Sequence, residues 1–385
     1  MTATATQPAR PALAGDLIPV QGIADIEDGH GYLRTAGYRR SPADLPLPAA
    51  LVRTYGLRRG DTIEGSATTA PVTGGRGKSG AAIADITLIS GLPASAARKR
   101  PAFDDLTPLY PSERLRLEDG DASPTARIID LLTPIGKGQR GLIVAPPKAG
   151  KTMILKTIAH AIAAAHPEIH LMLVLVGERP EEVTDLRRTV GGEIISSTFD
   201  ESPADHIRAA ELAIERAKRL AELGRDVVVL LDSLTRLGRA YNLAAPASGR
   251  TLTGGVAAAA LQPPRQFLGA ARNLEEGGSV TIVSTALIDT GSLLDSVLFE
   301  EFKGTGNMEL RLRRDLAERR LFPALDPASS GTRRDDLLMD SAEHAALTSL
   351  RRALAGLDPQ HAMELLLDKT SQPTAQFLHQ IHAVR

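Results

Sequence analysis

The sequence predicts an α/β protein in which a small β-barrel domain precedes a parallel sheet flanked by helices. Three observations lead to this prediction. After residue 125, uninterrupted apolar stretches alternate with alanine-rich ones, which is typical of parallel strands joined by helices. Before residue 96, apolar segments are short, alternating and separated by turns, as in a barrel or sandwich. A phosphate-binding motif lies between one apolar stretch and the alanine-rich stretch that follows it, which favours a nucleotide-binding α/β core.

The composition limits the possible classes of function. The 385-residue chain has a formal net charge of −1, so a polyanion has to be bound by local clusters rather than by a global basic field. It contains no cysteine, which excludes disulfides and thiolate metal sites, and its nine histidines show no metal-ligand spacing. No apolar run reaches about 18 residues. We therefore expect a cytoplasmic protein.

The chain divides into four regions. Residues 1–15 lack the apolar stretch of a signal peptide and are expected to form a disordered tail. Residues 16–95 form the β-rich domain, with strands expected in LIPVQGIADI, GYLRTAG, DTIEGSA and AAIADITLI. Residues 96–125 are polar and proline-rich and are expected to be a linker, in which Arg98–Arg100 is interpreted as a solvated connector rather than an RNA contact. Residues 126–385 form the larger domain.

Strands and helices alternate in this larger domain. The strands are expected in RGLIVAPP, LMLVLVGE, DVVVLLDS and SVTIVSTAL, each bounded by Gly, Pro or a charged residue. The two clearest helices are KTMILKTIAHAIAAAH and PADHIRAAELAIERAKRLAELG. No repeat of 20–50 residues is found, which argues against a solenoid or propeller.

The stretch APPKAGKT, residues 145–152, differs from a standard phosphate-binding loop because Ala145 replaces the first glycine. Backbone N–H groups do most of the phosphate binding in such loops, so conformation matters more than side-chain identity. Gly150 remains where the chain passes closest to phosphate, and a helix beginning at Lys151 adds its positive end. Upstream, TGGRGKSG (73–80) also contains Gly-Lys-Ser, but a strand follows it. We interpret that segment as a basic turn.

Two carboxylates are expected to complete the nucleotide site. Asp232 ends the buried strand VVVLLD, where a Walker B aspartate would contact Mg²⁺ together with the Thr152 hydroxyl. Glu178 follows the strand LMLVLVG, where a carboxylate can orient and deprotonate the attacking water. The alternative for Glu178 is a solvated carboxylate beside Arg179.

These motifs, taken together, resemble the family of the bacterial transcription termination factor Rho. The likeness runs from about Asp105 to Leu338 and is carried by APPKAGKTMILKTIA, GERPEEVTDLRR, AKRLAELGRDVVVLLDSLTRLGRAYN, SGRTLTGGV, EEFKGTGNMEL and SGTRRDDLL. The alanine-led, proline-bearing loop is itself the form found in that family. The resemblance implies a RecA-like ATPase core after an OB or cold-shock barrel, a homohexameric ring, and ATP with Mg²⁺ bound between subunits. It also implies single-stranded RNA in the pore and the RNA polymerase elongation complex as a partner.

The resemblance also implies a set of site residues in the larger domain. Four residues are expected to be catalytic. Glu178 resembles the catalytic glutamate, Lys151 a phosphate lysine and Asp232 the Walker B carboxylate. Arg333 resembles an arginine finger inserted into a neighbour's site. An arginine supplied in trans makes hydrolysis depend on assembly. Arg239 and Arg320 resemble further interface and site arginines. The residues expected to contact the nucleotide are Gly136, Lys137, Gly138, Gln139, Arg140, Gly141, Lys148, Ala149, Gly150, Lys151, Thr152, Met153 and Arg179.

The expected RNA-binding residues follow the family pattern less closely. In the barrel they are Gly29, His30, Gly31, Tyr32, Leu33, Arg34, Arg76 and Lys78; in the motor domain they are Arg250, Thr290, Gly291 and Leu293. Histidine stands where the family has a first aromatic residue, and the next aromatic position reads Pro46. Compensation by the arginines would make RNA binding steeply dependent on salt. The pore lysine position is Leu293, and Ala257 replaces an aspartate of the family. The small helical piece that usually precedes the barrel is not found.

Three functions are compatible with these residues. The first is a Rho-like RNA-dependent ATPase and 5′→3′ helicase that terminates transcription. The second is an RNA or polymerase clamp of the same fold that binds ATP but translocates weakly, which Leu293 and the lost aromatic residues favour. The third, a rotary ATP synthase subunit or a RecA-like recombinase, shares the core fold but does not explain GHGYLR or DTGS.

Overall fold

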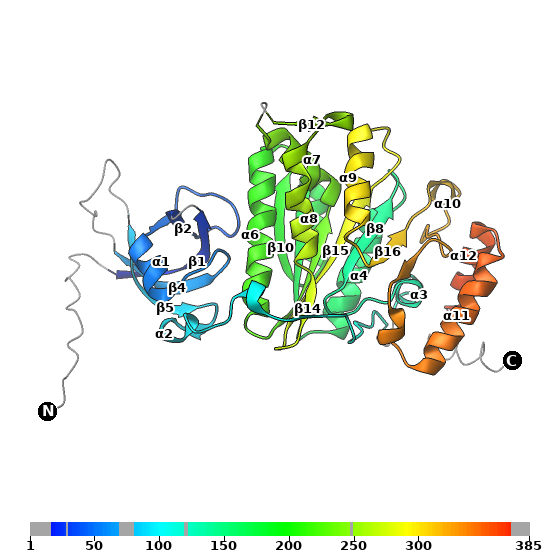
Figure 1. The fold of residues 1–385 in the computed structure, drawn as a ribbon, viewed down its shortest axis with the longest axis horizontal. Helices are drawn as coiled ribbons and strands as arrows, with labels where there is room; N and C mark the ends of the chain where they lie inside the picture. Colours follow the sequence, from blue (N-terminus) through cyan, green and yellow to red (C-terminus); the bar gives the residue numbers. More distant parts are fainter. Residues whose placement is uncertain (1–16, 28–29, 69–80, 119–121, 247–248, 371–385) are drawn as a thin grey trace. The chain divides into compact units, whose positions relative to one another are not determined.

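The computed structural model describes residues 17–27, 30–68, 81–118, 122–246 and 249–370. Figure 1 shows the ribbon, coloured along the chain. The chain forms two compact units, residues 1–100 and 101–385, each with its own internal contacts. Residues 1–16, expected to hold the tail, and the basic turn at 73–80 lie outside the described residues.

The first unit is a six-stranded antiparallel sheet with strand order β3-β2-β1-β4-β5-β6. β3 also lies close to β5, so the sheet curls towards a barrel. Its interior is formed by alternate residues of the strands, among them Ala24, Leu33 and Ile63, as the period of two in a strand requires. The elements are β1 (Leu17–Glu27), β2 (His30–Arg34), β3 (Leu45–Leu47), α1 (Ala49–Tyr55), β4 (Thr62–Thr68), β5 (Ala82–Ile89), β6 (Leu92–Pro93) and α2 (Ala94–Ala97).

The segment expected to be a linker differs from that prediction between residues 101 and 118. Strand β7 (Pro108–Leu109) pairs with β14 (Arg272–Leu274) of the second unit. Leu115 and Leu117 are fully buried in the core of that unit. Most of the other side chains of the segment face solvent, which explains its polar composition. It is part of the second unit, with only a short 3₁₀ turn, η1 (Phe103–Asp105), before β7.

The second unit is built on a mainly parallel sheet with strand order β10-β9-β11-β15-β8-β16-β17 (Figure 1). The four apolar stretches predicted as strands are confirmed as β8 (Arg140–Ala145), β9 (His170–Glu178), β11 (Asp226–Asp232) and β15 (Ser279–Leu287). The remaining strands are β10 (Glu193–Thr198), β12 (Thr251–Leu252), β13 (Val256–Ala257), β16 (Met308–Arg311) and β17 (Gly331–Thr332). β17 runs antiparallel to β16 at the edge of the sheet.

Helices cover both faces of this sheet, because right-handed crossovers that move in opposite directions lie on opposite faces. α4 (Lys151–Ala165) and α5 (Pro180–Thr189) connect β8, β9 and β10; α6 (Pro203–Ala221), α7 (Leu234–Ala244) and α9 (Leu293–Lys303) accompany the return towards β15 and β16. The two predicted helices are confirmed as α4 and α6. The other helical segments are α3 (Pro124–Leu132), η2 (Thr253–Gly255), η3 (Ala258–Ala260), α8 (Gln262–Gly269), α10 (Arg314–Glu318), η4 (Asp335–Leu337), α11 (Ser341–Ala355) and α12 (Pro359–Lys369).

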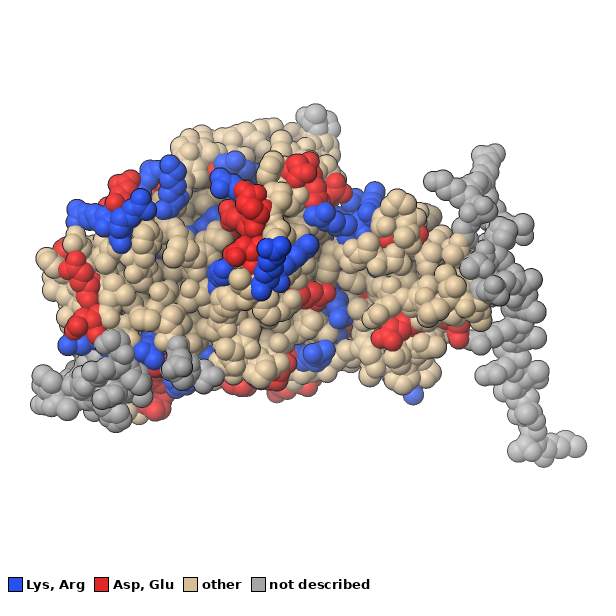
Figure 2. Space-filling model, turned by 180° about the vertical axis from the view of Figure 1, so that it is seen from behind, with Lys and Arg blue, Asp and Glu red and all other residues tan. Residues whose placement is uncertain are grey.

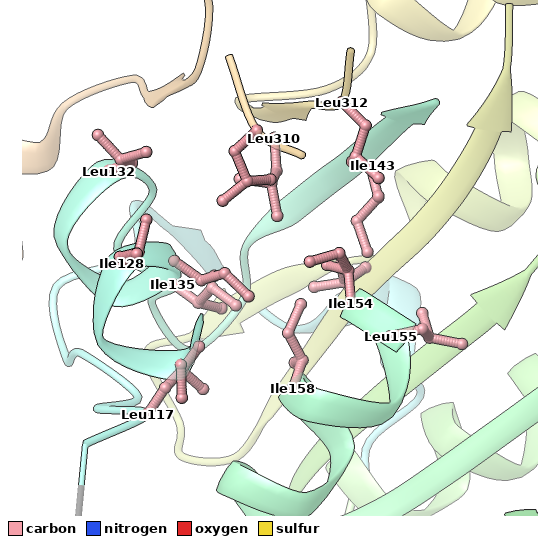
Figure 3. Packing of buried hydrophobic residues seen from close by; sticks show 14 of the residues in the cluster. Leu117, Ile128, Leu132, Ile135, Ile143, Ile154, Leu155, Ile158, Leu310 and Leu312 are labelled. Atoms are coloured by element: carbon pink, nitrogen blue, oxygen red, sulfur yellow. The ribbon is translucent and has the colours of Figure 1, made fainter. Parts of the chain in front are cut away.

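The core of the second unit lies between β8, α3 and α4. Figure 3 shows side chains from these elements interlocking with those of β16 and the residue after it. Those labelled are Leu117, Ile128, Leu132, Ile135, Ile143, Ile154, Leu155, Ile158, Leu310 and Leu312. Because this packing fixes the end of β8 against the start of α4, it also fixes the loop that joins them.

Candidate functional site

The turn between β8 and α4 has the backbone geometry of an anion-binding loop. Lys148 has φ 67° and Gly150 has φ 94°. A left-handed conformation at Gly150 is accessible because glycine has no Cβ. No side chain caps the amino end of α4, so the first N–H groups of the helix remain available to an anion. The loop with Ala145 in place of glycine is therefore built to bind phosphate.

Lys151 joins the two predicted carboxylates. Its Nζ atom lies 2.7 Å from both Oδ1 and Oδ2 of Asp232 and 3.0 Å from Oε1 of Glu178. The carboxylates come from the carboxyl ends of β11 and β9, and both are buried. Thr285, on β15, donates to Oδ1 of Asp232 at 2.8 Å. The structure thus brings together three of the four residues expected to be catalytic.

A second cation, which was not expected from the sequence, holds Glu178. The Arg236 guanidinium lies 2.5 Å from Oε1 of Glu178 and donates to the carbonyl oxygen of Gly177 at 2.7 Å. Burial and the nearby Asp232 carboxylate raise the pKa of Glu178, while Lys151 and Arg236 act to lower it. A pKa above the ordinary value brings a glutamate closer to the strength wanted in a general base. Arg236 lies one turn after Asp232 in the sequence, which is the signal that could have identified it.

The site also fits Mg²⁺. Mg²⁺ is usually held by one or two carboxylates, hydroxyls and the phosphates of the nucleotide rather than by an all-protein cluster. The Thr152 hydroxyl and the Asp232 carboxylate both lie close to Lys151 Nζ, at 3.4 and 2.7 Å. Among the described residues, no group of three or more His, Cys, Asp or Glu side chains could hold a metal ion by itself. Binding of Mg²⁺ together with a nucleotide does not need such a group.

The rim of the turn carries the remaining expected nucleotide contacts. Lys148, Met153 and Arg179 are exposed around it, and Ala149 is buried beneath it. Phe322, which the sequence analysis did not select, packs against the turn: its ring lies 3.7 Å from the position that a Cβ on Gly150 would occupy. An aromatic face beside a phosphate loop is a suitable surface for a nucleotide base.

The segment from Gly136 to Gly141 lies elsewhere in the chain's own fold. It leads into β8 and includes the first two residues of that strand, whereas Lys148–Met153 follows the strand; β8 itself is about 16 Å long at ~3.3 Å per residue. Gly138 donates to the Thr281 hydroxyl at 2.8 Å, and Lys137 pairs with Asp226 at 2.8 Å. Within a single chain the two segments therefore lie at opposite ends of the sheet, so the prediction that both line one nucleotide requires a site shared between two copies.

Arg333 lies at the same amino end as this segment. Its N–H donates to the carbonyl oxygen of Asn307 at 2.8 Å, and Asn307 in turn donates to Arg140 at 2.9 Å. The Asn307 side chain also binds the buried side chain of Gln139, at 2.6 Å. Within the described part of the chain, the Arg333 side chain forms no hydrogen bond or ion pair with Lys151, Glu178 or Asp232.

Two of the loops expected to contact RNA meet beside α9. Arg250 is exposed just before β12, and Leu293 is the first residue of α9, 58% exposed. A Cβ on Gly254, in η2, would lie 3.2 Å from the Leu293 Cγ atom. The structure thus brings the Arg250 hairpin close to the loop of Thr290, Gly291 and Leu293.

A buried carboxylate connects the Thr290 loop to α7. Asp295 accepts from the Thr290 hydroxyl at 2.6 Å and binds the Arg239 guanidinium through both oxygens, at 2.8 and 2.5 Å. Arg239 lies on α7, the helix that begins two residues after Asp232. One helix therefore links the carboxylate cluster to the loop beside Leu293.

In the barrel, only part of the expected RNA-binding segment faces solvent. Tyr32 is 46% exposed, and His30 is exposed on the same face of β2. Gly31 and Leu33 face the interior, where Leu33 is a core residue, so their selection as RNA contacts was wrong. The period of two along a strand is the reason. Gly29, Arg76 and Lys78 lie outside the described residues.

Arg34, expected to contact RNA, is not a free cation in the structure. It is buried and paired with Asp25 at 2.5 Å and Asp44 at 2.7 Å. Its guanidinium lies 5.3 Å from the centroid of the Tyr32 ring. Arg34 therefore supports the tyrosine from behind instead of reaching out to a phosphate.

Figure 2 shows Lys and Arg mixed with Asp and Glu over the visible face of the second unit. This agrees with the net charge of −1 and with local rather than global binding of any polyanion. None of the helices in the described part of the chain combines the length and hydropathy needed to span a bilayer.

Two family models match the chain. One, described as the nucleotide-binding domain of the ATP synthase alpha/beta family, matches residues 125–332; the other, described as the RNA-binding domain of the Rho termination factor, matches residues 20–92. Among solved structures, an ATPase from the type III secretion system of pathogenic bacteria is 23% identical, with a TM-score of 0.58, over 72% of this chain and 82% of that one. These matches confirm the predicted fold class, a RecA-like core preceded by a small barrel.

Several proteins named transcription termination factor Rho are similar to almost the whole chain. That of Streptosporangium roseum is 56% identical over 380 residues, covering 98% of this chain and 96% of that protein. Those of Streptomyces lividans and Micrococcus luteus are 59% and 57% identical, covering 95% and 94% of this chain but 52% and 54% of theirs. The chain thus spans about half the length of the latter two relatives.

Proposed function

The chain belongs to the family of transcription termination factor Rho, and we propose that it is an RNA-dependent ATPase that moves 5′→3′ along single-stranded RNA and terminates transcription. Its partners would be nascent RNA, the RNA polymerase elongation complex and further copies of itself in a hexameric ring. It would act in the cytoplasm. The observation that carries this proposal is the cluster of Lys151, Glu178 and Asp232 at the phosphate-binding turn, in a chain that also has a barrel with an exposed aromatic residue.

The triphosphate would bind with its β- and γ-phosphates at the amino end of α4. Lys151 would then exchange part of its contact with the two carboxylates for the phosphate oxygens, an interaction that is likewise charge-assisted. Mg²⁺, held by Thr152 and Asp232, would neutralise charge on the phosphates as it develops. Phe322 offers its ring to the base. The exposed Lys148 and Arg179 would supply further cations at the rim.

Glu178 would take the proton of the attacking water. Its raised pKa makes it a better proton acceptor than an ordinary glutamate, and Arg236 fixes one of its two oxygens at 2.5 Å. The second oxygen remains to orient water. Because phosphoryl transfer is loose, positioning of the water and stabilisation of charge supply most of the rate enhancement.

A complete site would need a second copy. Arg333 and Gly136–Gly141 lie at the amino end of β8, and Lys151 lies about 16 Å away at the other end. An arginine side chain does not extend that far. Stacked head to tail, however, the amino end of one copy would meet the carboxyl end of the next, as in a heterologous ring. Arg333 and the glycine-rich segment would then approach a neighbour's nucleotide.

Hydrolysis would be coupled to RNA through α7. This helix begins beside Asp232 and carries Arg236, which holds Glu178, and Arg239, which holds Asp295. Asp295 in turn binds Thr290 in the loop expected to contact RNA. A small rotation of α7 on loss of the γ-phosphate would therefore change both ends of this connection.

The proposal is tested by the ATP turnover of the purified protein with and without poly(C) RNA. We expect RNA to stimulate turnover, and Glu178→Gln to reduce it by about 10²–10⁴-fold with the melting temperature unchanged. Full turnover by Glu178→Gln would remove Glu178 from the role assigned to it. Turnover that is indifferent to RNA would contradict the RNA-dependent motor.

Leu293 favours the second candidate, a clamp that binds ATP and RNA but translocates weakly, because an exposed leucine offers no charge to the RNA backbone. Displacement of a DNA strand from an RNA–DNA hybrid separates the two. ATP-dependent displacement supports the motor. ATP turnover and RNA binding without displacement support the clamp.

A further inference from the structure

An exposed aromatic ring lies beside Arg333, and the proposed function leaves it without a role. Tyr110 follows β7 and is 67% exposed. The guanidinium of Arg334, the residue directly after Arg333, lies over this ring at 5.6 Å from its centroid. Leu109 next to it is exposed as well. Tyr110, Arg333 and Arg334 therefore belong to one surface at the amino end of the sheet, which we call the Tyr110 face.

Several contacts position the parts of the Tyr110 face. Arg334 adopts a left-handed backbone conformation, with φ 57°, and its side chain binds Asp336 through two contacts of 3.0 and 3.1 Å. Pro111 packs against the glycine-rich segment so closely that a Cβ on Gly136 would lie 2.7 Å from its own Cβ. An aromatic residue with little freedom to lose is well suited to act as an anchor in a protein interface.

The rim of the nucleotide turn is complementary to this face. It exposes two large apolar side chains, Met153 at 61% and Phe199 at 64%; Phe199 donates its N–H to the carbonyl oxygen of Glu178 at 3.2 Å. The first turn of α5 adds Glu181 and Glu182. Apolar surface and carboxylates on the rim thus match the tyrosine and Arg333 on the Tyr110 face.

We propose that Tyr110, backed by Arg334, docks on the nucleotide-site rim of a second copy of this chain and thereby positions Arg333 for catalysis in that copy. The inference rests on the proposed function, because it requires Arg333 to act on a neighbour. A copy that brings Arg333 to the phosphates beside Lys151 also brings Tyr110 to the rim, since the ring lies beside Arg334, the residue directly after Arg333. Tyr110 is then a positioning residue rather than a catalytic one.

The first test compares Tyr110→Ala with Tyr110→Phe in the full chain. Because the ring is exposed, neither change should lower the melting temperature. We expect Tyr110→Ala to reduce the kcat of poly(C)-stimulated ATP hydrolysis by about tenfold, with a much smaller change in KM for ATP. Tyr110→Phe, which keeps the ring, should restore most of the rate. Equal rates for wild type and Tyr110→Ala would overturn the proposal.

The second test asks in which copy Tyr110 acts. Tyr110→Ala and Glu178→Gln chains are mixed one to one and assembled with poly(C). Hydrolysis of ATP is followed in a single turnover, so that the reaction at one site does not depend on hydrolysis at the other sites of the ring. A Glu178→Gln chain cannot hydrolyse ATP but still presents an intact Tyr110. In random assembly about half of the Tyr110→Ala sites would have such a neighbour, so we expect about half of them to react at the wild-type rate.

An Arg333→Ala chain mixed with Glu178→Gln is the control for the proposed function. Recovery in both mixtures supports both conclusions. Recovery with Arg333→Ala alone shows that arginine acts in trans but that Tyr110 does not, and overturns the inference made here. If the mixture with Arg333→Ala shows no recovery, the nucleotide site is not shared between copies. That result would also overturn the docking role of Tyr110.

Discussion

Arg236 and Glu178 form a 2.5 Å ion pair across the ends of α7 and β9. The same arginine donates to the carbonyl oxygen of Gly177, so it fixes the carboxylate of the residue expected to activate water and the backbone directly before that residue. Lys151 Nζ lies 3.0 Å from the same Oε1 atom. The carboxylate is therefore held by two cations in a buried place where burial alone would favour its protonated form.

This arrangement predicts how ATP turnover depends on pH. Burial and Asp232 raise the pKa of Glu178, and a general base is active only when deprotonated, so the acid limb of the kcat profile should lie above the range of an ordinary glutamate. Arg236→Gln removes a cation that lowers this pKa. The acid limb should then move to higher pH. A limb that stays in place while the rate falls would mean that Arg236 acts on something other than the Glu178 proton.

Lys151→Ala should have two separable effects. It removes the cation at the phosphates, so ATP affinity, measured by isothermal titration, should fall by at least about tenfold, the loss of one charge-assisted contact of ~1.5–3 kcal/mol. It also leaves two buried carboxylates together, which should raise the pKa of Glu178 further. Lys151→Arg is the matched control, because it retains the charge. Unchanged ATP binding by Lys151→Ala would contradict the site.

Tyr32 is expected to carry most of the stacking in the barrel. Tyr32→Ala should weaken binding of a short single-stranded RNA by about one order of magnitude or more, since a stacked base contributes ~1–3 kcal/mol. Tyr32→Phe should bind almost as well as wild type, and Leu33→Ala should lower the melting temperature because Leu33 is buried. Filter binding at fixed salt measures the first pair. Equal loss in Tyr32→Ala and Tyr32→Phe would point to the hydroxyl instead of the ring.

Leu293→Lys tests whether the leucine limits translocation. A lysine at the first position of α9 would add a cation beside Arg250, and each phosphate contact makes binding more dependent on salt. We expect tighter RNA coupling, seen as a lower RNA concentration for half-maximal ATPase activity and faster strand displacement. Leu293→Met, which changes shape without charge, is the control. Strand displacement that is equally slow in both variants would show that the leucine is not the limiting feature.

The sequence predicted the core strands and the phosphate-binding turn because both depend on local pattern. β9 and β11 are apolar throughout, and Lys151 follows a glycine at a strand end. β10 was missed because its sequence, EIISST, is largely polar, as an edge strand allows. β16 was missed because it has only four residues.

Other errors arose where position in space, rather than sequence, decides the role. Arg34 has the sequence context of an RNA-binding cation, but Asp25 and Asp44 come from neighbouring parts of the barrel to neutralise it. Gly136–Gly141 lies within ten residues of the turn expected to bind phosphate, and it is β8 that places the two at opposite ends of the sheet. The sequence gives no direct sign of either relationship.

The placement of Arg333 at one end of β8 and Lys151 at the other has a further consequence for any ring assembled in the proposed way. Each chain contributes Lys151 to one nucleotide site and Arg333 to another, and it contains no complete site. An open chain of n copies contains n − 1 complete sites. At one end the Arg333 of the terminal copy has no neighbouring nucleotide site, and at the other end a nucleotide site lacks an arginine from a neighbour. Closing the ring around a strand of RNA completes the last site. Ring closure would therefore raise the number of active sites from n − 1 to n.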